Sequence, residues 1–253
     1  MKTLSTIIVA ILMASTASAQ VRRTFDVDKF DHIKINAPTE ITITQGKKHE
    51  IKAEYNLPEG MELIVDTHMN ILSIRINNKR YQTNEHHYIK LHITMSKLRV
   101  LDSKGAIDLC LNKMKTDNLI LKSNGAAVID IVDLECENLQ INQNGAADIE
   151  GTIRCKGNAT INTNGAGDYS LDINANGFSL STNGASEAEV VFAGKGCTIS
   201  SNGASEIDLT AECESLSCES HGSSTITAKG TADITKIKSH GASKINTSML
   251  NQF

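Results

Sequence analysis

The chain has 253 residues, and its 29 acidic side chains outnumber its 25 basic ones, which gives a formal net charge of −4. The imbalance lies in residues 101–253, which hold 11 Lys or Arg against 19 Asp or Glu. This acidic excess argues against nucleic-acid binding, because neutralising the phosphates of a nucleic acid needs clustered basic residues. Only two prolines, no tryptophan and many small and β-branched residues favour strands over helices.

Residues 1–19 have the organisation of a removable export signal. Lys2 supplies the positive region, residues 7–13 the apolar run, and Ala17-Ser18-Ala19 the small-residue cleavage site. The apolar run is too short to span a bilayer, and no later segment reaches transmembrane length. We therefore expect a mature chain that is exported to the periplasm, the outer surface or the medium, without membrane insertion.

A short motif, most often Asn-Gly-Ala, recurs along residues 101–245. Residues four before and four after its glycine are nearly all apolar, as Leu121 and Ile129 are around Gly125. Alternating apolar positions on both sides of a turn indicate two short strands per repeat, and a looser column with Leu134 and Ile153 indicates a third side. Spaced 20, 20, 20, 19, 19, 19 and 19 residues apart, the glycines are Gly105, Gly125, Gly145, Gly165, Gly184, Gly203, Gly222 and Gly241.

Two architectures have this pattern. Asn-Gly between alternating strands is a strong hairpin signal, so eight hairpins in a meander are one alternative. A parallel solenoid is favoured because it explains why the same residue recurs in the same column, with each copy one rung above the last at roughly 4.8 Å. We therefore predict an all-β fold, a single-stranded parallel β-helix or solenoid of about eight rungs with 19–20 residues each.

The segment before the repeat alternates like strands, with turns at Gln45-Gly46 and Pro58-Glu59-Gly60. Because an exposed end rung is an adhesive sheet edge, we expect this segment to form an antiparallel β region that caps and extends the solenoid. The expected organisation is a single domain over residues 30–245, with the cap at 30–100 and the repeat rungs at 101–245.

Three features together resemble a known family: the segment Ile41 to Gly46, the segment Ile89 to Leu98, and the tandem Asn-Gly-Ala rungs. They are similar to the head GIN domain of putative autotransporter adhesins, exported proteins of Bacteroidota-type bacteria. The resemblance covers about residues 30–245. It implies a β-helix-like fold and residence at the outer surface or in the periplasm, and it assigns no catalytic residues.

The residue before each glycine forms a column that we expect to hydrogen-bond along the axis as a side-chain ladder. His221 and His240 are close enough to share a metal, but without an obvious third ligand we interpret them as ladder substitutes for Asn. Cys136 and Cys155 stack in neighbouring rungs, and buried free thiols are favoured there over a disulfide. The ladder consists of Asn124, Asn144, Asn164, Asn183, Asn202, His221 and His240.

Acidic residues recur three and five positions after the glycines, at offsets that face outward together. Either they form a solvated face that keeps the protein soluble, which we favour, or they bind Ca²⁺ or a basic partner, because oxygen ligands suit that ion. No other cofactor is expected. The candidate face consists of Asp148, Glu150, Asp168, Glu187, Glu189, Glu206 and Asp208, with Asp108 and Asp130 in the earlier rungs.

Adhesion-type recognition of a glycan or protein by a non-catalytic module at the cell envelope fits these features best. The alternative is a carbohydrate-active β-helix enzyme, a polysaccharide lyase or hydrolase that uses carboxylates of the acidic face. Against catalysis, the acidic columns are repetitive, whereas an active site needs one rung to differ from its neighbours. At the C-terminal end only Met249, Leu250 and Phe253 could cover the last rung, so self-association into a homo-oligomer is a further expectation.

Overall fold

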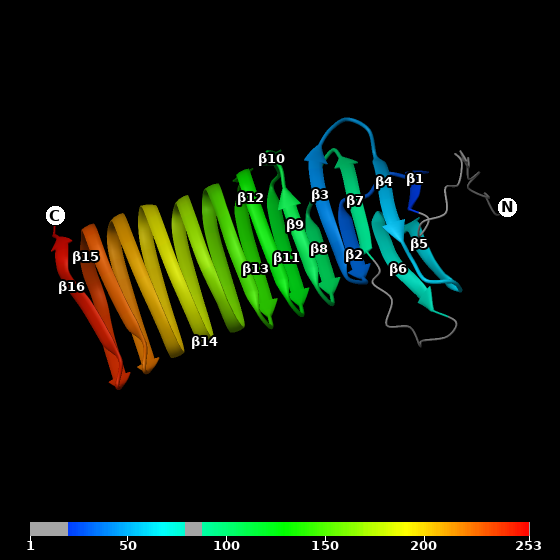
Figure 1. Cartoon of the computed structure of the whole chain (residues 1–253). Coiled ribbons are helices and arrows are strands. Elements are labelled where there is room, and N and C mark those ends of the chain that lie inside the picture. The colour runs from blue at the N-terminus through cyan, green and yellow to red at the C-terminus, as the bar shows by residue number, and fades with distance from the viewer. Residues whose placement is uncertain (1–19, 79–87, 253) are drawn as a thin grey trace.

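The computed structural model describes residues 20–78 and 88–252 and shows an elongated coil of stacked strands (Figure 1). These residues form strands and turns without a helix, so none of them belongs to a helix that could cross a membrane. The predicted export signal, residues 1–19, lies outside the described residues.

Strands of successive rungs stack in parallel along three sides of the coil. On the first side Leu101 lies opposite Leu121, which lies opposite Ile141, so each column of the repeat is a line of neighbours in space. The second side is built in the same way, with Ile129 opposite Ile149. These strands are β8 (Val100–Lys104), β11 (Asn118–Asn124) and β13 (Asn138–Asn144) on the first side, β9 (Ile107–Leu111) and β12 (Ala127–Cys136) on the second, and β10 (Met114–Lys115), paired with the end of β12, on the third.

The later rungs are one continuously extended chain. Strand β14 (Ala147–Gly222) winds through several rungs without a break (Figure 1). It pairs in parallel with β15 (Thr225–Gly241), which pairs in parallel with β16 (Lys244–Asn251). The prediction of a parallel solenoid is therefore confirmed, and the meander is wrong, because neighbouring strands of a meander are antiparallel.

The N-terminal region is antiparallel only in part, which corrects the expectation of an antiparallel cap. Strands β2 (His32–Asn36) and β3 (Thr39–Gln45) pair in parallel with β8 and β9, so they form a rung of the coil. Strands β6 (Ile71–Asn78) and β7 (Tyr88–Met95) pair in parallel with the opposite edges of β2 and β3. The chain thus forms the inner rung first, with β2 and β3, then the outer rung, with β6 and β7, and then continues into β8 on the other side of the inner rung.

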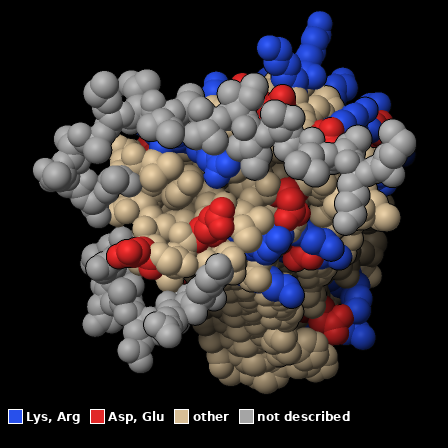
Figure 2. Space-filling view, turned by 90° about the vertical axis from the view of Figure 1, so that its right-hand side faces the viewer, with Lys and Arg blue, Asp and Glu red and all other residues tan. Residues whose placement is uncertain are grey.

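The antiparallel strands cover that outer rung and extend the sheet beyond it. Three strands do this: β4 (Glu50–Asn56) on β7, β1 (Val21–Asp26) on β4, and β5 (Met61–His68) on β6. Seen from this end, acidic and basic side chains are interspersed over the described surface, with no field of a single sign (Figure 2). Antiparallel strands therefore cover the outer rung, and their described surface carries charges of both signs.

One apolar core runs the length of the coil, filled by the inward columns; Leu121, Ile141 and Ile161 are each at most 1% exposed. The turn glycines allow the rungs to stack this closely. Gly165 has φ +146°, and a Cβ on it would lie 2.0 Å from the carbonyl oxygen of Gly145 one rung below. Only glycine fits there, since any side chain would collide with the backbone of the rung beneath.

Candidate functional site

The three outward sides of the coil carry three different chemistries. On the first side, the outward columns lie one, three and five residues before each turn glycine. From the rung of Gly145 to that of Gly203 they contain only uncharged polar side chains, all exposed or half-buried. We call this surface the amide–hydroxyl face; it consists of Gln140, Asn142, Asn144, Thr160, Asn162, Asn164, Ser179, Ser181, Asn183, Thr198, Ser200 and Asn202.

Side-chain amides on this side hydrogen-bond from rung to rung. Asn144 donates to Asn124 at 3.1 Å, Asn164 donates to Asn144 at 3.0 Å, and Asn183 donates to Asn164 at 3.3 Å. A second bond of the same kind runs from Asn162 to Asn142 at 3.1 Å. Because an amide has two donor hydrogens and an acceptor oxygen, each of these residues keeps hydrogen-bonding capacity that faces outward.

The second side carries the acidic columns. Asp148 and Glu150 follow Val128 and Asp130 in register, and all seven residues of the candidate acidic face are exposed. The structure therefore brings these carboxylates onto one side at rung spacing, where like charges repel. Val128 stands in an acidic column and is 47% exposed, so the array is interrupted at that rung. A solvated face stays the prediction here, with Ca²⁺ binding as its alternative.

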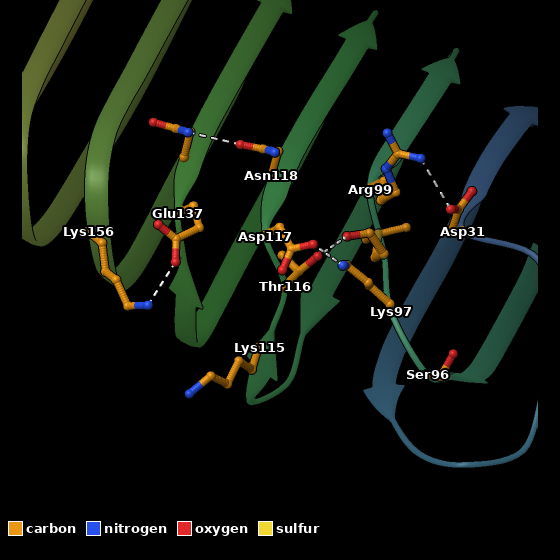
Figure 3. A network of polar contacts seen from close by, with 12 residues as sticks. Asp31, Ser96, Lys97, Arg99, Lys115, Thr116, Asp117, Asn118, Glu137 and Lys156 are labelled. Carbon is orange, nitrogen blue, oxygen red and sulfur yellow. Dashed lines mark hydrogen bonds and ion pairs between the residues drawn. The ribbon is translucent and has the colours of Figure 1, made fainter.

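The third side pairs its charges across rungs. Lys115 contacts Glu135 at 3.1 Å, and Arg154 in the next rung contacts the same carboxylate at 3.7 Å. One column along, Glu137 accepts a hydrogen bond from Lys156 at 2.7 Å. These side chains line an open groove of about 800 Å³. Figure 3 shows the pair of Glu137 with Lys156 and the pair of Asp117 with Lys97, each of which joins two successive rungs.

These ion pairs lower the pKa of their carboxyl groups, which favours the charged form. A hydrogen bond from Lys97 lowers the pKa of Asp117, and one from Lys115 lowers the pKa of Glu135. Every carboxylate in these pairs has a basic partner, and the groove is lined by five basic and three acidic side chains, in contrast to the acidic face. The pairs are solvent-exposed, so each contributes little to stability.

Sequence reasoning missed this groove, although a signal for it is present. Lys115, Glu135 and Arg154 are separated by 20 and 19 residues, and Asp117, Glu137 and Lys156 follow the same spacing. Opposite charges one repeat length apart, as in Lys115 with Glu135 and Glu137 with Lys156, predict ion pairs between rungs, just as a recurring Asn predicts a ladder.

All six cysteines are free thiols in the structure, and five of them are buried. The Sγ atoms of Cys136 and Cys155 lie 2.9 Å apart beneath the groove, in register on adjacent rungs. That contact and burial raise the pKa of the Cys136 thiol. Cys110 is half-buried beside Asp130, and burial together with this carboxylate raises its pKa. A raised pKa keeps a thiol protonated at neutral pH, so Cys110 and Cys136 are poor nucleophiles.

The two histidines of the first side depart from the Asn ladder. Their rings stack with centroids 4.6 Å apart and an interplanar angle of 12°, and His221 lies in register with His240. Glu219 contacts His221 Nε2 at 3.2 Å and Lys236 Nζ at 2.5 Å. Hydrogen bonds from Lys236 and His221 lower the pKa of Glu219 to about 2. The sequence interpretation had found no third group beside the histidines, and the structure supplies one.

Comparison with known proteins assigns this chain to a family. The sequence profile of the family described as "Putative auto-transporter adhesin, head GIN domain" matches residues 29–195 and 179–252. The chain belongs to this family. The resemblance seen in the sequence is confirmed, and with it a surface-adhesin-like class of protein. A search of curated proteins finds no match.

Solved structures with a similar fold come from Bacteroides and Parabacteroides species. A putative adhesin from Bacteroides fragilis is 22% identical, with a TM-score of 0.63, covering 91% of this chain and 97% of that one. A putative adhesin from Parabacteroides distasonis is 14% identical, with a TM-score of 0.69 and coverage of 91% and 98%. A structure described as a putative lipid binding protein from Parabacteroides distasonis is 14% identical, with a TM-score of 0.57 and coverage of 92% and 96%. At these identities the likeness shows the fold alone.

Proposed function

We propose that this protein is an exported, non-catalytic adhesin head that binds neutral glycans through its amide–hydroxyl face. The observation that carries the proposal is the absence of charge from that face over four successive rungs, in a chain whose other two described sides are charged. Residues 1–19 and membership of an adhesin family support export to the periplasm, the outer surface or the medium.

The chemistry of the face suits sugars. Amides and hydroxyls each donate and accept hydrogen bonds, as sugar hydroxyls do, whereas a charged side chain must lose much of its hydration to bind a neutral group. The face repeats at the rung spacing, so one polymer can contact several rungs, and the summed weak contacts give useful avidity. A recurring flat array is also the opposite of the single distinct rung that catalysis requires.

The chain itself offers substitutions that test the proposal without disturbing the coil. Ser181 and Ser200 lie in the outward column that carries Lys at Lys122 and Lys238, so Ser181→Lys and Ser200→Lys are compatible with the fold. Each places a long charged side chain over the face. Ser170→Lys does the same on the acidic side and is the matched control.

The experiment is a glycan array probed with residues 20–253, followed by titration calorimetry with the neutral glycans that bind. We expect binding that falls at least about tenfold in each of the two face variants and is unchanged in Ser170→Lys. Incubation with the same glycans should release no reducing ends. Binding that survives both face variants would refute the role of this face, and released products would favour the enzymatic alternative.

A further inference from the structure

The side chains of Glu219, His221 and His240 converge on the first side of the coil, near its C-terminal end. Their ligand atoms, one carboxylate oxygen and one imidazole nitrogen from each ring, all lie within 4.8 Å of one another. Glu219 and His221 are two residues apart on one extended strand, so both point outward, and His240 occupies the next rung. Three ligands thus come from two rungs.

Two outward columns of the first side change residue type at these rungs. The column of His221 and His240 holds Asn in the five preceding rungs. The column of Glu219 holds Asn162, Ser181 and Ser200 in the three rungs before it. Two imidazole nitrogen donors and one carboxylate therefore replace neutral ladder residues together, and they do so where their side chains touch.

We propose that Glu219, His221 and His240 bind a divalent first-row transition metal ion, of the kind represented by Zn²⁺. Two imidazoles and a carboxylate form a donor set that suits Zn²⁺, Ni²⁺ or Cu²⁺ and does not suit Ca²⁺. Ligand atoms at about 2.0–2.2 Å from a tetrahedral ion are roughly 3.3 Å from one another. The contact between Glu219 and His221, at 3.2 Å, already matches that spacing.

Metal binding requires a small rotation of the two imidazole rings. Stacked rings cannot both present in-plane lone pairs to one ion, so the imidazoles of His221 and His240 must turn toward each other. His240 is exposed and His221 half-buried, which leaves both rings room to do so. The ion then joins the two rungs, with solvent in the fourth position.

Lys236 opposes the ion. Its ammonium lies 2.5 Å from the second oxygen of Glu219 and neutralises that carboxylate. Earlier rungs have Thr160, Ser179 and Thr198 in the column of Lys236, so Lys236→Thr restores a residue that the coil accepts there. Removing the competing cation should tighten metal binding severalfold, which a merely incidental pair of histidines would not explain.

The test is Zn²⁺ calorimetry on residues 20–253, with a thermal melt in the presence and absence of the ion. His221→Asn, His240→Asn and Glu219→Ser each insert the residue that preceding rungs carry in the same column. We expect one ion per chain, a raised melting temperature, and a loss of affinity of at least about tenfold in each variant. Excess Ca²⁺ should not displace Zn²⁺.

The matched control is the double variant His86→Asn with His87→Asn, which removes the adjacent histidines elsewhere in the sequence and should leave Zn²⁺ affinity unchanged. Circular dichroism of each variant verifies the fold. The proposal is overturned if wild-type protein shows no saturable Zn²⁺ binding. It is equally overturned if His221→Asn or His240→Asn binds as wild type, or if the control variant loses binding.

Discussion

Replacing turn glycines by alanine should separate two costs to stability: the strain of a positive φ, and the collision of a new side chain with the rung below. In Gly184→Ala, the new Cβ would lie 1.9 Å from the carbonyl oxygen of Gly165, and φ at this position is +144°. Gly105→Ala provides the matched control. It occupies the same column with φ +102°, but its Cβ would meet no atom closer than 3.9 Å.

The expected costs follow from these geometries. A non-glycine residue held at positive φ costs about 1–3 kcal/mol, and both variants incur this. Only Gly184→Ala must also push two rungs apart by about 1 Å or more, and overpacking of this kind costs about 1–3 kcal/mol further. We therefore expect a destabilisation of about 1–3 kcal/mol for Gly105→Ala and about 2–6 kcal/mol for Gly184→Ala.

Urea unfolding of residues 20–253, followed by circular dichroism, measures the difference between the two variants. Because repeat proteins can open locally, hydrogen exchange should show protection lost first in the rungs on either side of the substitution. Equal unfolding midpoints for the two variants would refute the reasoning, since they would mean that close approach of the rungs does not require glycine.

Three further perturbations test other contacts. A hydrogen bond from Lys97 lowers the pKa of Asp117 below 3.8, so the pair stabilises the fold above pH 3.8, and this stabilisation is lost as the pH falls through the lowered pKa. In Lys97→Met, the melting temperature should therefore fall less steeply as the pH is lowered through this range. Mild oxidation should join Cys136 to Cys155 before any other pair, which peptide mass spectrometry would detect, and a different first pair would contradict the 2.9 Å contact. Asn164→Ala removes two ladder hydrogen bonds and should cost about 1 kcal/mol in urea unfolding, and no change would mean that the exposed ladder adds no stability.

The solenoid itself could be predicted because two periodicities agree in this sequence. The alternation of period two decides which residues face inward, and the spacing of 19–20 residues decides which of them meet across rungs. Leu121, Ile141 and Ile161 were assigned to one column by alignment alone, and they are buried neighbours. The same assignment extends along the whole coil because each rung repeats the packing of the one before it.

The N-terminal cap could not be predicted in the same way because it lacks the repeat. Alternation identified its strands, but alternation does not say which strands pair or in which direction. The chain places β2 and β3 between β6 and β7 on one side and β8 and β9 on the other, so strand order in space departs from order along the chain. Partners separated by this much sequence leave no local signal.

The histidine cluster shows a second limit of column reasoning and what the structure adds to it. Aligning on the glycine places His221 and His240 in one line, yet the third group, Glu219, lies in a different column and meets them only because outward columns of one strand are adjacent in space. The location also matters for stability. Ile237 occupies the apolar column of Ile199 and Cys218, which are buried, but is itself 40% exposed in the described chain. Burial therefore holds these last rungs less firmly than the central ones, and an ion that joins two of them would act where apolar packing contributes least.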